Sequence, residues 1–295
     1  MTNKLSGLGT AMITPFQADG RVDFEALARL VELQIEGGTD YLVVLGTTGE
    51  AVTLSEREKH EVVDFVVNTV DSRLPLVLGL GGNNTAAVVE TVNQWSETLS
   101  RHFAAILSVC PYYNKPSQEG LYRHFCALAE ASPVPVILYN VPGRTGVNLL
   151  PETVVRLHKA CGSRIAGIKE ASGNIEQIKH LIDLMRSYPD FLVISGDDGI
   201  AAQLMDAGAA GLISVAANAF PREFGRIVND HNHDLQQRFS PMVSLLFKEG
   251  NPAGIKTVLS FQGLINNVLR LPLVTNSAHV QEEIKQELSA LKSCL

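Results

Sequence analysis

Lys169 has the surroundings of a nucleophilic amine. It follows a short apolar run in the segment RIAGIKEA, residues 164–171, whose residue types favour a strand. Alternation along a strand would place Ile165, Gly167 and Lys169 on one face. If that face is buried, desolvation disfavours the ammonium form, and the neutral amine can attack a ketone to form a Schiff base. The alternative is a lysine whose stem lies on apolar surface while its amine reaches water.

Tyr139 and Arg144 lie together in a second segment, VILYNVPGRTG, residues 136–146. Tyr139 ends an apolar run and shares a strand face with Ile137, where its phenol could relay protons to and from a carbinolamine. Arg144 lies in the loop beyond, and its planar guanidinium suits a carboxylate. The alternatives are a tyrosine at the edge of the core and a surface arginine.

Thr47 and Thr48 occupy a glycine-bounded loop, GTTGE, residues 46–50. The glycines permit a tight turn and a close approach to a ligand, and the hydroxyl and backbone N–H groups can hold a carboxylate. The loop lacks the pattern of a phosphate-binding P-loop, and a plain turn is the alternative.

Two further loops contain polar side chains. Tyr112 and Tyr113 are adjacent in PYYNKP, residues 111–116, where they suit either a site or a subunit contact. The acids of SGDD, residues 195–198, are interpreted as a turn and helix N-cap rather than a metal site, because no histidine or third acid is suitably spaced. The histidines, His124 among them, fall on predicted helices and are interpreted as surface residues.

These groups follow apolar, β-branched runs that alternate with segments of helical period. The runs predict eight parallel strands, at Gly9–Thr14, Tyr41–Leu45, Leu76–Gly79, Ala104–Val109, Val136–Tyr139, Ile165–Ile168, Leu192–Ser195 and Gly211–Val215. We predict an α/β fold, a (β/α)8 TIM barrel, in which the loops after the strands meet at one end and gather the polar groups. A doubly wound open sheet is the alternative.

Signals for helix starts support the predicted barrel, and the barrel in turn divides the chain into two parts. Asp23 is a predicted N-cap, Ser55 and Glu58 form a predicted capping box, and Asn174 with Gln177 indicates a similar start. Residues 1–220 are assigned to the barrel through its eighth strand. Residues 221–295 are assigned to the eighth barrel helix and a C-terminal helical appendage of the same domain.

Composition narrows the class of protein. The 295 residues have a formal net charge of −7 and 45% hydrophobic content, which suit a globular protein and argue against nucleic acid as the main partner. Four cysteines without a C-x-x-C pair or zinc-ligand spacing indicate reduced thiols of a cytoplasmic protein. We expect no signal peptide and no membrane span.

The segments GTTGE, YNVPGRTG and GIKEA together resemble the N-acetylneuraminate lyase/dihydrodipicolinate synthase superfamily, from the first strand to the C-terminal helices. Within it, the Thr-Thr pair, the arginine after the fifth strand and the tandem tyrosines resemble the dihydrodipicolinate synthases. Neuraminate lyases usually have a Ser-Thr variant and lack that arginine.

The resemblance implies roles in catalysis for four residues. Lys169 would form the Schiff base with pyruvate, and Thr47, Tyr139 and Tyr113 would form a proton relay. The counterpart of Tyr113 enters from the neighbouring subunit in the family, which implies a homotetramer made of two dimers, or a homodimer.

Further residues are implied in substrate binding. Thr48 would bind the pyruvate carboxylate, Arg144 would receive L-aspartate-4-semialdehyde, and main-chain groups near Gly196 and Ile213 would line the pocket. The implied reaction is a lyase-class condensation to 4-hydroxy-tetrahydrodipicolinate, the first committed step of diaminopimelate and lysine biosynthesis. It needs no metal or organic cofactor, since Lys169 is the electron sink. The alternatives are another pyruvate-dependent aldolase and an inactive barrel with a binding role.

A lysine effector site at the dimer interface is also implied, but in a degenerate form. Its positions here are Ala51, Glu56, Lys59, Asn83, Ala87 and Tyr112. Glu56 and Lys59 stand where the family commonly has histidines, and Ala87 replaces a glutamate that would accept from the ligand ammonium. Losing one such charge-assisted bond costs about 1.5–3 kcal/mol, so we predict weak or absent inhibition by L-lysine.

Overall fold

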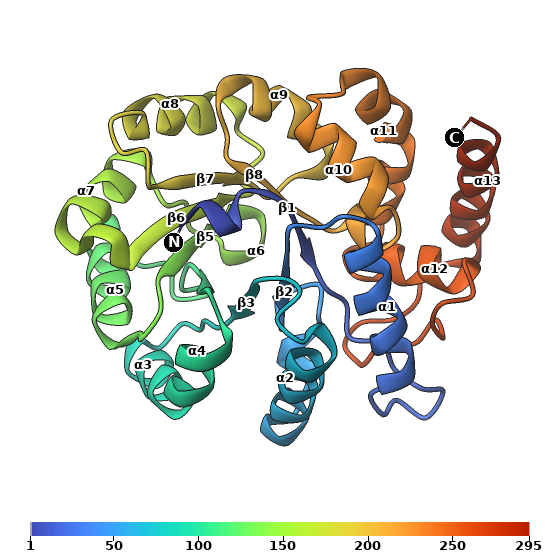
Figure 1. Cartoon of the computed structure of the whole chain (residues 1–295), viewed down its shortest axis with the longest axis horizontal. Coiled ribbons are helices and arrows are strands. Elements are labelled where there is room, and N and C mark those ends of the chain that lie inside the picture. The colour runs from blue at the N-terminus through green and yellow to red at the C-terminus, as the bar shows by residue number, and fades with distance from the viewer. Residues whose placement is uncertain (1, 295) are drawn as a thin grey trace.

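The eight strands close into a parallel barrel in chain order (Figure 1). A computed structural model describes residues 2–294. The strands are β1 (Gly7–Ala11), β2 (Tyr41–Val44), β3 (Leu76–Gly79), β4 (Ala105–Val109), β5 (Val136–Asn140), β6 (Ile165–Glu170), β7 (Leu192–Ser195) and β8 (Gly211–Ser214). Because β8 pairs with β1, the predicted barrel is confirmed and the open sheet is wrong.

Helices surround the barrel as an outer layer (Figure 1). They are α1 (Phe24–Glu36), α2 (Glu56–Val70), α3 (Thr85–Gln94), α4 (Ser96–His102), α5 (Gln118–Ala131), α6 (Pro142–Thr145), α7 (Pro151–Cys161), α8 (Ile175–Met185), α9 (Ala201–Ala207) and α10 (Pro221–Asn229). The chain ends with α11 (His233–Phe247), α12 (Ala253–Phe261) and α13 (Ala278–Cys294). Helix α10 packs against β1 and β8, and α13 packs against α11 and α12.

The predicted helix caps are present. The Asp23 carboxylate accepts from the Ala26 N–H, and Ser55 with Glu58 forms a complete capping box. Asn174 accepts from the Gln177 N–H, but the Gln177 side chain does not return to the cap. It donates to Asn148 and Glu170 instead, so this start is only half of a capping box.

Two strand predictions are wrong by more than one residue, whereas the bounds of β2, β4, β5 and β8 are each wrong by a single residue. Strand β1 begins and ends earlier than predicted, at Gly7 and Ala11, and β6 continues past Ile168, so Lys169 lies inside the strand. The predicted common face of Ile165, Gly167 and Lys169 is wrong for Ile165. A register shift opposite Val136 and Ile137 turns Ile165 toward the helices, while Gly167 and Lys169 pair with the inward-facing Ile137 and Tyr139.

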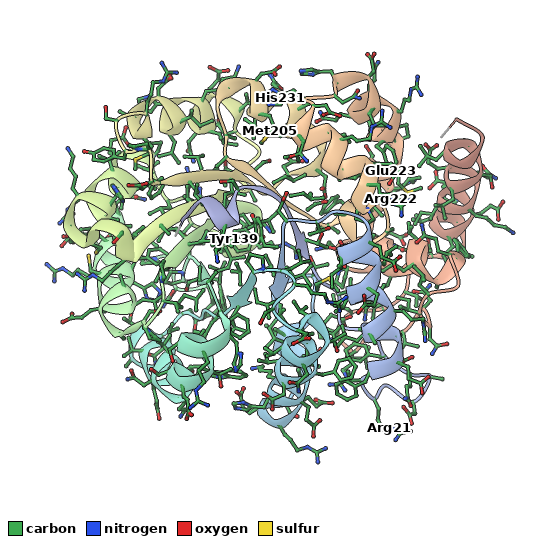
Figure 2. All side chains as sticks on the ribbon, viewed as in Figure 1. Arg21, Tyr139, Met205, Arg222, Glu223 and His231 are labelled. Atoms are coloured by element: carbon green, nitrogen blue, oxygen red, sulfur yellow. The ribbon has the colours of Figure 1, made fainter. Side chains whose placement is uncertain are left out.

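The barrel interior is a small core separate from the larger one under the helices. It is formed by Tyr41, Val43, Val77, Ala105, Leu107, Ile137, Tyr139, Leu192, Ile194 and Ile213, with Leu5 and Ala11. Figure 2 shows Tyr139 within the ring of strands. No helix in residues 2–294 is long and apolar enough to cross a membrane.

Candidate active site

Lys169 projects into the barrel beside Tyr139. The two residues are register partners on β6 and β5, and the Lys169 Nζ lies 4.6 Å from the centroid of the Tyr139 ring. Lys169 is 5% exposed and Tyr139 8%. Gly196, just after β7, makes room for the lysine, because a Cβ there would lie 3.0 Å from Lys169 Cε. The amine is therefore largely shielded from bulk water yet reachable from one side.

That side is a cavity of about 1360 Å³ beyond the C-terminal ends of the strands. Six of the predicted site residues line it, namely Thr47, Thr48, Tyr139, Arg144, Lys169 and Gly196. Ile213 lies deeper, 1% exposed, among the interior side chains of the barrel. Tyr113 does not line the cavity within this chain, and its side chain is 90% exposed. Its role stays a prediction.

The GTTGE loop enters the cavity through a strained turn. Leu45, just after β2, has a φ of 58°, in the left-handed region. Gly79 is needed beside it, because a Cβ there would lie 2.4 Å from the Leu45 carbonyl oxygen. The Gly49 carbonyl accepts from the Thr14 hydroxyl at 2.7 Å, which ties the loop to the segment after β1.

The two threonines of this loop differ in exposure. Thr47 is exposed at the cavity, whereas Thr48 is 3% exposed. The Thr48 Oγ1 accepts a hydrogen bond of 2.9 Å from the Asn251 side-chain amide. Accepting this bond occupies a lone pair of the oxygen and leaves the Thr48 hydroxyl hydrogen as a donor at the cavity wall.

Arg144 lies on α6, a single turn between β5 and α7. Pro142 begins this turn, and Gly146 ends it with a φ of 72°. The Arg144 side chain is exposed beside the cavity and has no ion-pair partner among the described residues. It is available to an anionic ligand.

Buried acids hold the neighbouring loops without facing the amine. Alternation points Glu170 outward, where it accepts from Asn140 and from the Ser172 N–H, and burial raises the pKa of its carboxyl. Asp198 accepts from the Ser214 hydroxyl and the Val215 N–H after β8, and burial raises its pKa to about 6. Both acids are structural supports of the strand ends.

No group of three potential metal ligands occurs among residues 2–294. The SGDD loop is a turn, as predicted, with Asp197 capping the short 3-10 helix Asp198–Ile200. The prediction for His124 is wrong. Its side chain is 3% exposed, its Nδ1 lies 2.9 Å from the Thr85 hydroxyl, and burial lowers its pKa to about 4.

The predicted effector residues line the outer part of the same cavity. Lys59 pairs with Glu56 at 2.6 Å, and the Asn83 side chain donates to the Tyr112 carbonyl at 3.1 Å. The charges of Glu56 and Lys59 thus compensate each other. The structure brings all six positions together, and their binding of L-lysine stays a prediction.

Sequence reasoning missed the contribution of the C-terminal helices. Val243, Ser244 and Phe247 of α11, with Asn251, form one wall of the cavity. It also missed a buried ion pair between Glu50, at the end of the GTTGE loop, and Lys256 of α12. The available signal was a lysine in the otherwise apolar or small-residue run AGIKTVLSF.

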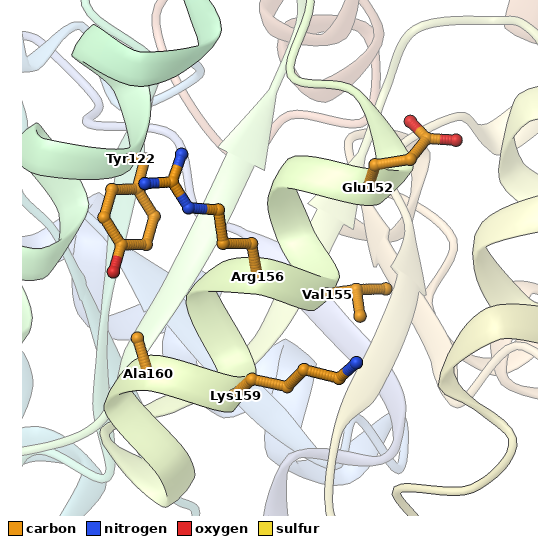
Figure 3. Close-up of a pocket in the computed structure, with 6 residues that line it drawn as sticks. All are labelled: Tyr122, Glu152, Val155, Arg156, Lys159 and Ala160. Carbon is orange, nitrogen blue, oxygen red and sulfur yellow. The ribbon is translucent and has the colours of Figure 1, made fainter.

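A smaller pocket of about 460 Å³ lies on the outside of the barrel along α5 and α7 (Figure 3). It is lined by Tyr122, Glu152, Val155, Arg156, Lys159 and Ala160. The Arg156 guanidinium lies 3.6 Å from the Tyr122 ring centroid and pairs with Glu119. None of the predicted site residues lies there.

Comparison with known proteins gives consistent matches along the chain. The model of the dihydrodipicolinate synthetase family matches residues 4–291. A protein of Parabacteroides distasonis named 4-hydroxy-tetrahydrodipicolinate synthase is 50% identical over 295 residues, covering 97% of each chain. One of the same name from Phocaeicola vulgatus is 48% identical and covers 98% of each chain.

Solved structures agree. The dihydrodipicolinate synthase of Thermotoga maritima has a TM-score of 0.91 at 39% identity, covering 97% of this chain and 98% of that one. The enzyme of Acinetobacter baumannii, solved with pyruvate, has a TM-score of 0.90 at 40% identity, covering 97% and 98%. The likeness therefore includes both the fold and nearly the whole length.

Proposed function

The chain belongs to the dihydrodipicolinate synthetase family, and from this premise we propose that it acts as a 4-hydroxy-tetrahydrodipicolinate synthase, a lyase that condenses pyruvate with L-aspartate-4-semialdehyde. The observation that supports this most directly is the Lys169 amine, 5% exposed, beside Tyr139 and facing the large cavity. The product, 4-hydroxy-tetrahydrodipicolinate, leads to diaminopimelate and lysine.

The first half-reaction joins pyruvate to Lys169. The neutral amine attacks the keto carbon of pyruvate to give a carbinolamine, which loses water to become an iminium. Tyr139 and Thr47 move the protons, and Thr48, whose hydroxyl hydrogen is a donor at the cavity wall, binds the carboxylate. Main-chain groups at Gly196 and Ile213 complete the pyruvate site. Loss of a methyl proton then gives the enamine.

The second half-reaction uses the unpaired Arg144. Its guanidinium binds the semialdehyde carboxylate while the enamine carbon attacks the aldehyde. The amino group of the semialdehyde then attacks the iminium carbon, which closes the ring and releases Lys169. Groups of the protein and of the two substrates suffice for every step, so we propose that no metal or organic cofactor takes part.

Assembly follows from Tyr113, whose side chain is 90% exposed at a residue with a φ of 74°. We propose that it completes the proton relay of a neighbouring subunit, in a dimer or a pair of dimers. Sedimentation of the active protein as a monomer would contradict this. The cytoplasm is the proposed compartment, as the cysteine pattern indicates.

Reduction with borohydride in the presence of pyruvate tests the proposed chemistry. The reduced adduct should add mass to the protein, and peptide mapping should place it on Lys169. Lys169→Ala should prevent labelling, whereas Lys159→Ala, at an exposed lysine of α7, should label normally. A coupled assay with the semialdehyde then separates this synthase from other pyruvate aldolases. Labelling that persists in Lys169→Ala would contradict the assignment.

A further inference from the structure

Lys256 is buried where a lysine is costly. It lies in α12 with 0% side-chain exposure, and burial lowers its pKa to about 8 despite the opposing effect of Glu50. Its amine pairs with the Glu50 carboxylate, donates to the Val268 carbonyl at 3.0 Å and lies 4.1 Å from the Phe16 ring centroid. Well-packed apolar side chains often stabilise a fold as much as a buried ion pair does, so stability alone does not account for the Lys256–Glu50 pair. The pair is better explained by a need to hold the Glu50 side chain in one position.

Glu50, the last residue of the GTTGE loop, is held in place by both ends of its carboxylate. Its side chain is also 0% exposed, and its second carboxylate oxygen accepts from the Arg270 N–H at 3.1 Å. Its backbone has a φ of 52°, a conformation that side chains other than glycine rarely adopt. The Glu50 N–H donates to the Thr47 carbonyl at 3.1 Å and closes the turn that contains both threonines.

The segment that supplies Lys256 also contacts Thr48 directly. Asn251, just before α12, donates to the Thr48 hydroxyl oxygen at 2.9 Å. Arg270, after α12, donates to the Thr53 carbonyl at 2.9 Å, on the far side of the turn. Three points of one C-terminal segment therefore hold the loop that forms this wall of the cavity.

We propose that Lys256, through its ion pair with Glu50, is a positioning residue that fixes the Thr47–Thr48 turn for binding of the pyruvate carboxylate. The proposal rests on the proposed function. Lys256 does not line the cavity, so it acts through Glu50 and the turn rather than by contact with substrate. Arg144 lies on α6, after β5 rather than β2, and within residues 2–294 it makes no hydrogen bond or ion pair with Glu50 or Lys256, so semialdehyde binding should be spared.

The decisive variant is the double substitution Glu50→Gln with Lys256→Met. Lys256→Met alone leaves the Glu50 carboxylate buried without its counter-charge, so its melting temperature should fall. The double variant has no buried charge at either position and should recover most of that loss. It still lacks the anchor, so kcat/KM for pyruvate and the borohydride trapping rate at low pyruvate should remain ~10- to 100-fold low, as expected for misplaced binding groups.

The control is Lys248→Met, just after α11, which removes a surface ion pair with Glu283 in the same appendage. It should keep wild-type kinetics. In the double variant, KM for the semialdehyde should stay within about twofold of wild type, because Arg144 shares no partner with Glu50 or Lys256 and effects at independent sites rarely couple.

Two results would overturn the positioning role. One is a double variant with wild-type kcat/KM for pyruvate. The other is a double variant that loses both half-reactions equally and does not recover its melting temperature, which would indicate a purely structural pair. If Lys256→Met does not fold, the double variant alone decides. Failure of the wild-type protein to trap pyruvate would instead refute the proposed function, so the two failures are distinguishable.

Discussion

Gly196→Ala tests the placement of the nucleophile without removing any polar group. A Cβ at this position would lie 2.7 Å from Ala171 Cβ, 3.0 Å from Lys169 Cε and 3.1 Å from Lys169 Cγ. Its φ lies outside the left-handed region, so the backbone itself accepts alanine. The substitution therefore adds one methyl group against both Ala171 and the Lys169 stem, so the side chains around the nucleophile must shift to accommodate it.

The magnitude follows from the crowding. Adding a methyl group to a packed site typically costs about 1–3 kcal/mol, which in a chain of this size lowers the melting temperature by roughly 2–10 °C. Catalysis should suffer more, since misplacing a reacting group by about 1 Å can cost ~100-fold. We expect pyruvate trapping by borohydride, followed by intact mass at saturating pyruvate, to slow ~10- to 100-fold in a protein that is still folded.

The matched control is Gly225→Ala. Gly225 lies in the middle of α10, and a Cβ there would meet nothing within 4 Å apart from its own helix. Alanine favours a helix over glycine by about 1 kcal/mol, so this variant should trap pyruvate normally and melt at the same or a higher temperature. A wild-type trapping rate in Gly196→Ala would refute the idea that this glycine makes room for the nucleophile.

Three other perturbations have defined outcomes. Arg144→Ala removes a charge-assisted bond worth about 1.5–3 kcal/mol, so semialdehyde use should fall roughly 10- to 100-fold while pyruvate trapping persists, and equal loss of both would argue for a structural role. L-Lysine should inhibit weakly or not at all, because Ala87 offers its ammonium no acceptor, and losing one charge-assisted bond weakens the affinity for lysine roughly 10- to 100-fold. Half-maximal inhibition below about 1 mM lysine would contradict this. His124 binds its proton near pH 6.5 when unfolded and only at about pH 4 when folded, so it lowers stability progressively as pH falls from 6.5 to 4. His124→Gln should reduce the loss in unfolding free energy between pH 7 and 4.5 by about 2–3 kcal/mol in urea titrations, and an unchanged loss would show that His124 is not responsible.

The barrel was predictable because parallel strands covered on both faces are continuously apolar, and each of the eight predicted strands overlaps an observed one. Their ends were less predictable. Polarity suggested that β6 ends at Ile168, yet the sheet continues through Lys169 and Glu170 because both side chains find places, one inside the barrel and one outside. The face of Ile165 could not be foreseen, because a register shift depends on how two strands pair rather than on either sequence alone.

Some residues of the candidate site could be placed from the sequence, and others could not. The common location of Thr47, Tyr139, Arg144 and Lys169 was predictable because they lie near the C-terminal ends of β2, β5 and β6 or in the loops that follow, and barrel closure brings these strand ends together. The positions of Lys256 and His124 were not, since a charged or polar residue on a helix ordinarily lies at the surface. Their burial arises from contacts with distant parts of the chain, such as Glu50 for Lys256.

The packed end of the barrel explains why the amine is accessible from one direction only. Tyr41, at the start of β2, is 0% exposed and fills the interior so closely that a Cβ on Gly9 would lie 2.3 Å from its ring. Leu5, just before β1, lies in the same interior core. Side chains thus exclude water beneath Lys169, while the cavity above admits a ligand of limited size. Lys169 is thus enclosed by side chains on one side and open to the cavity on the other, so a carbonyl substrate can reach its amine from a single direction.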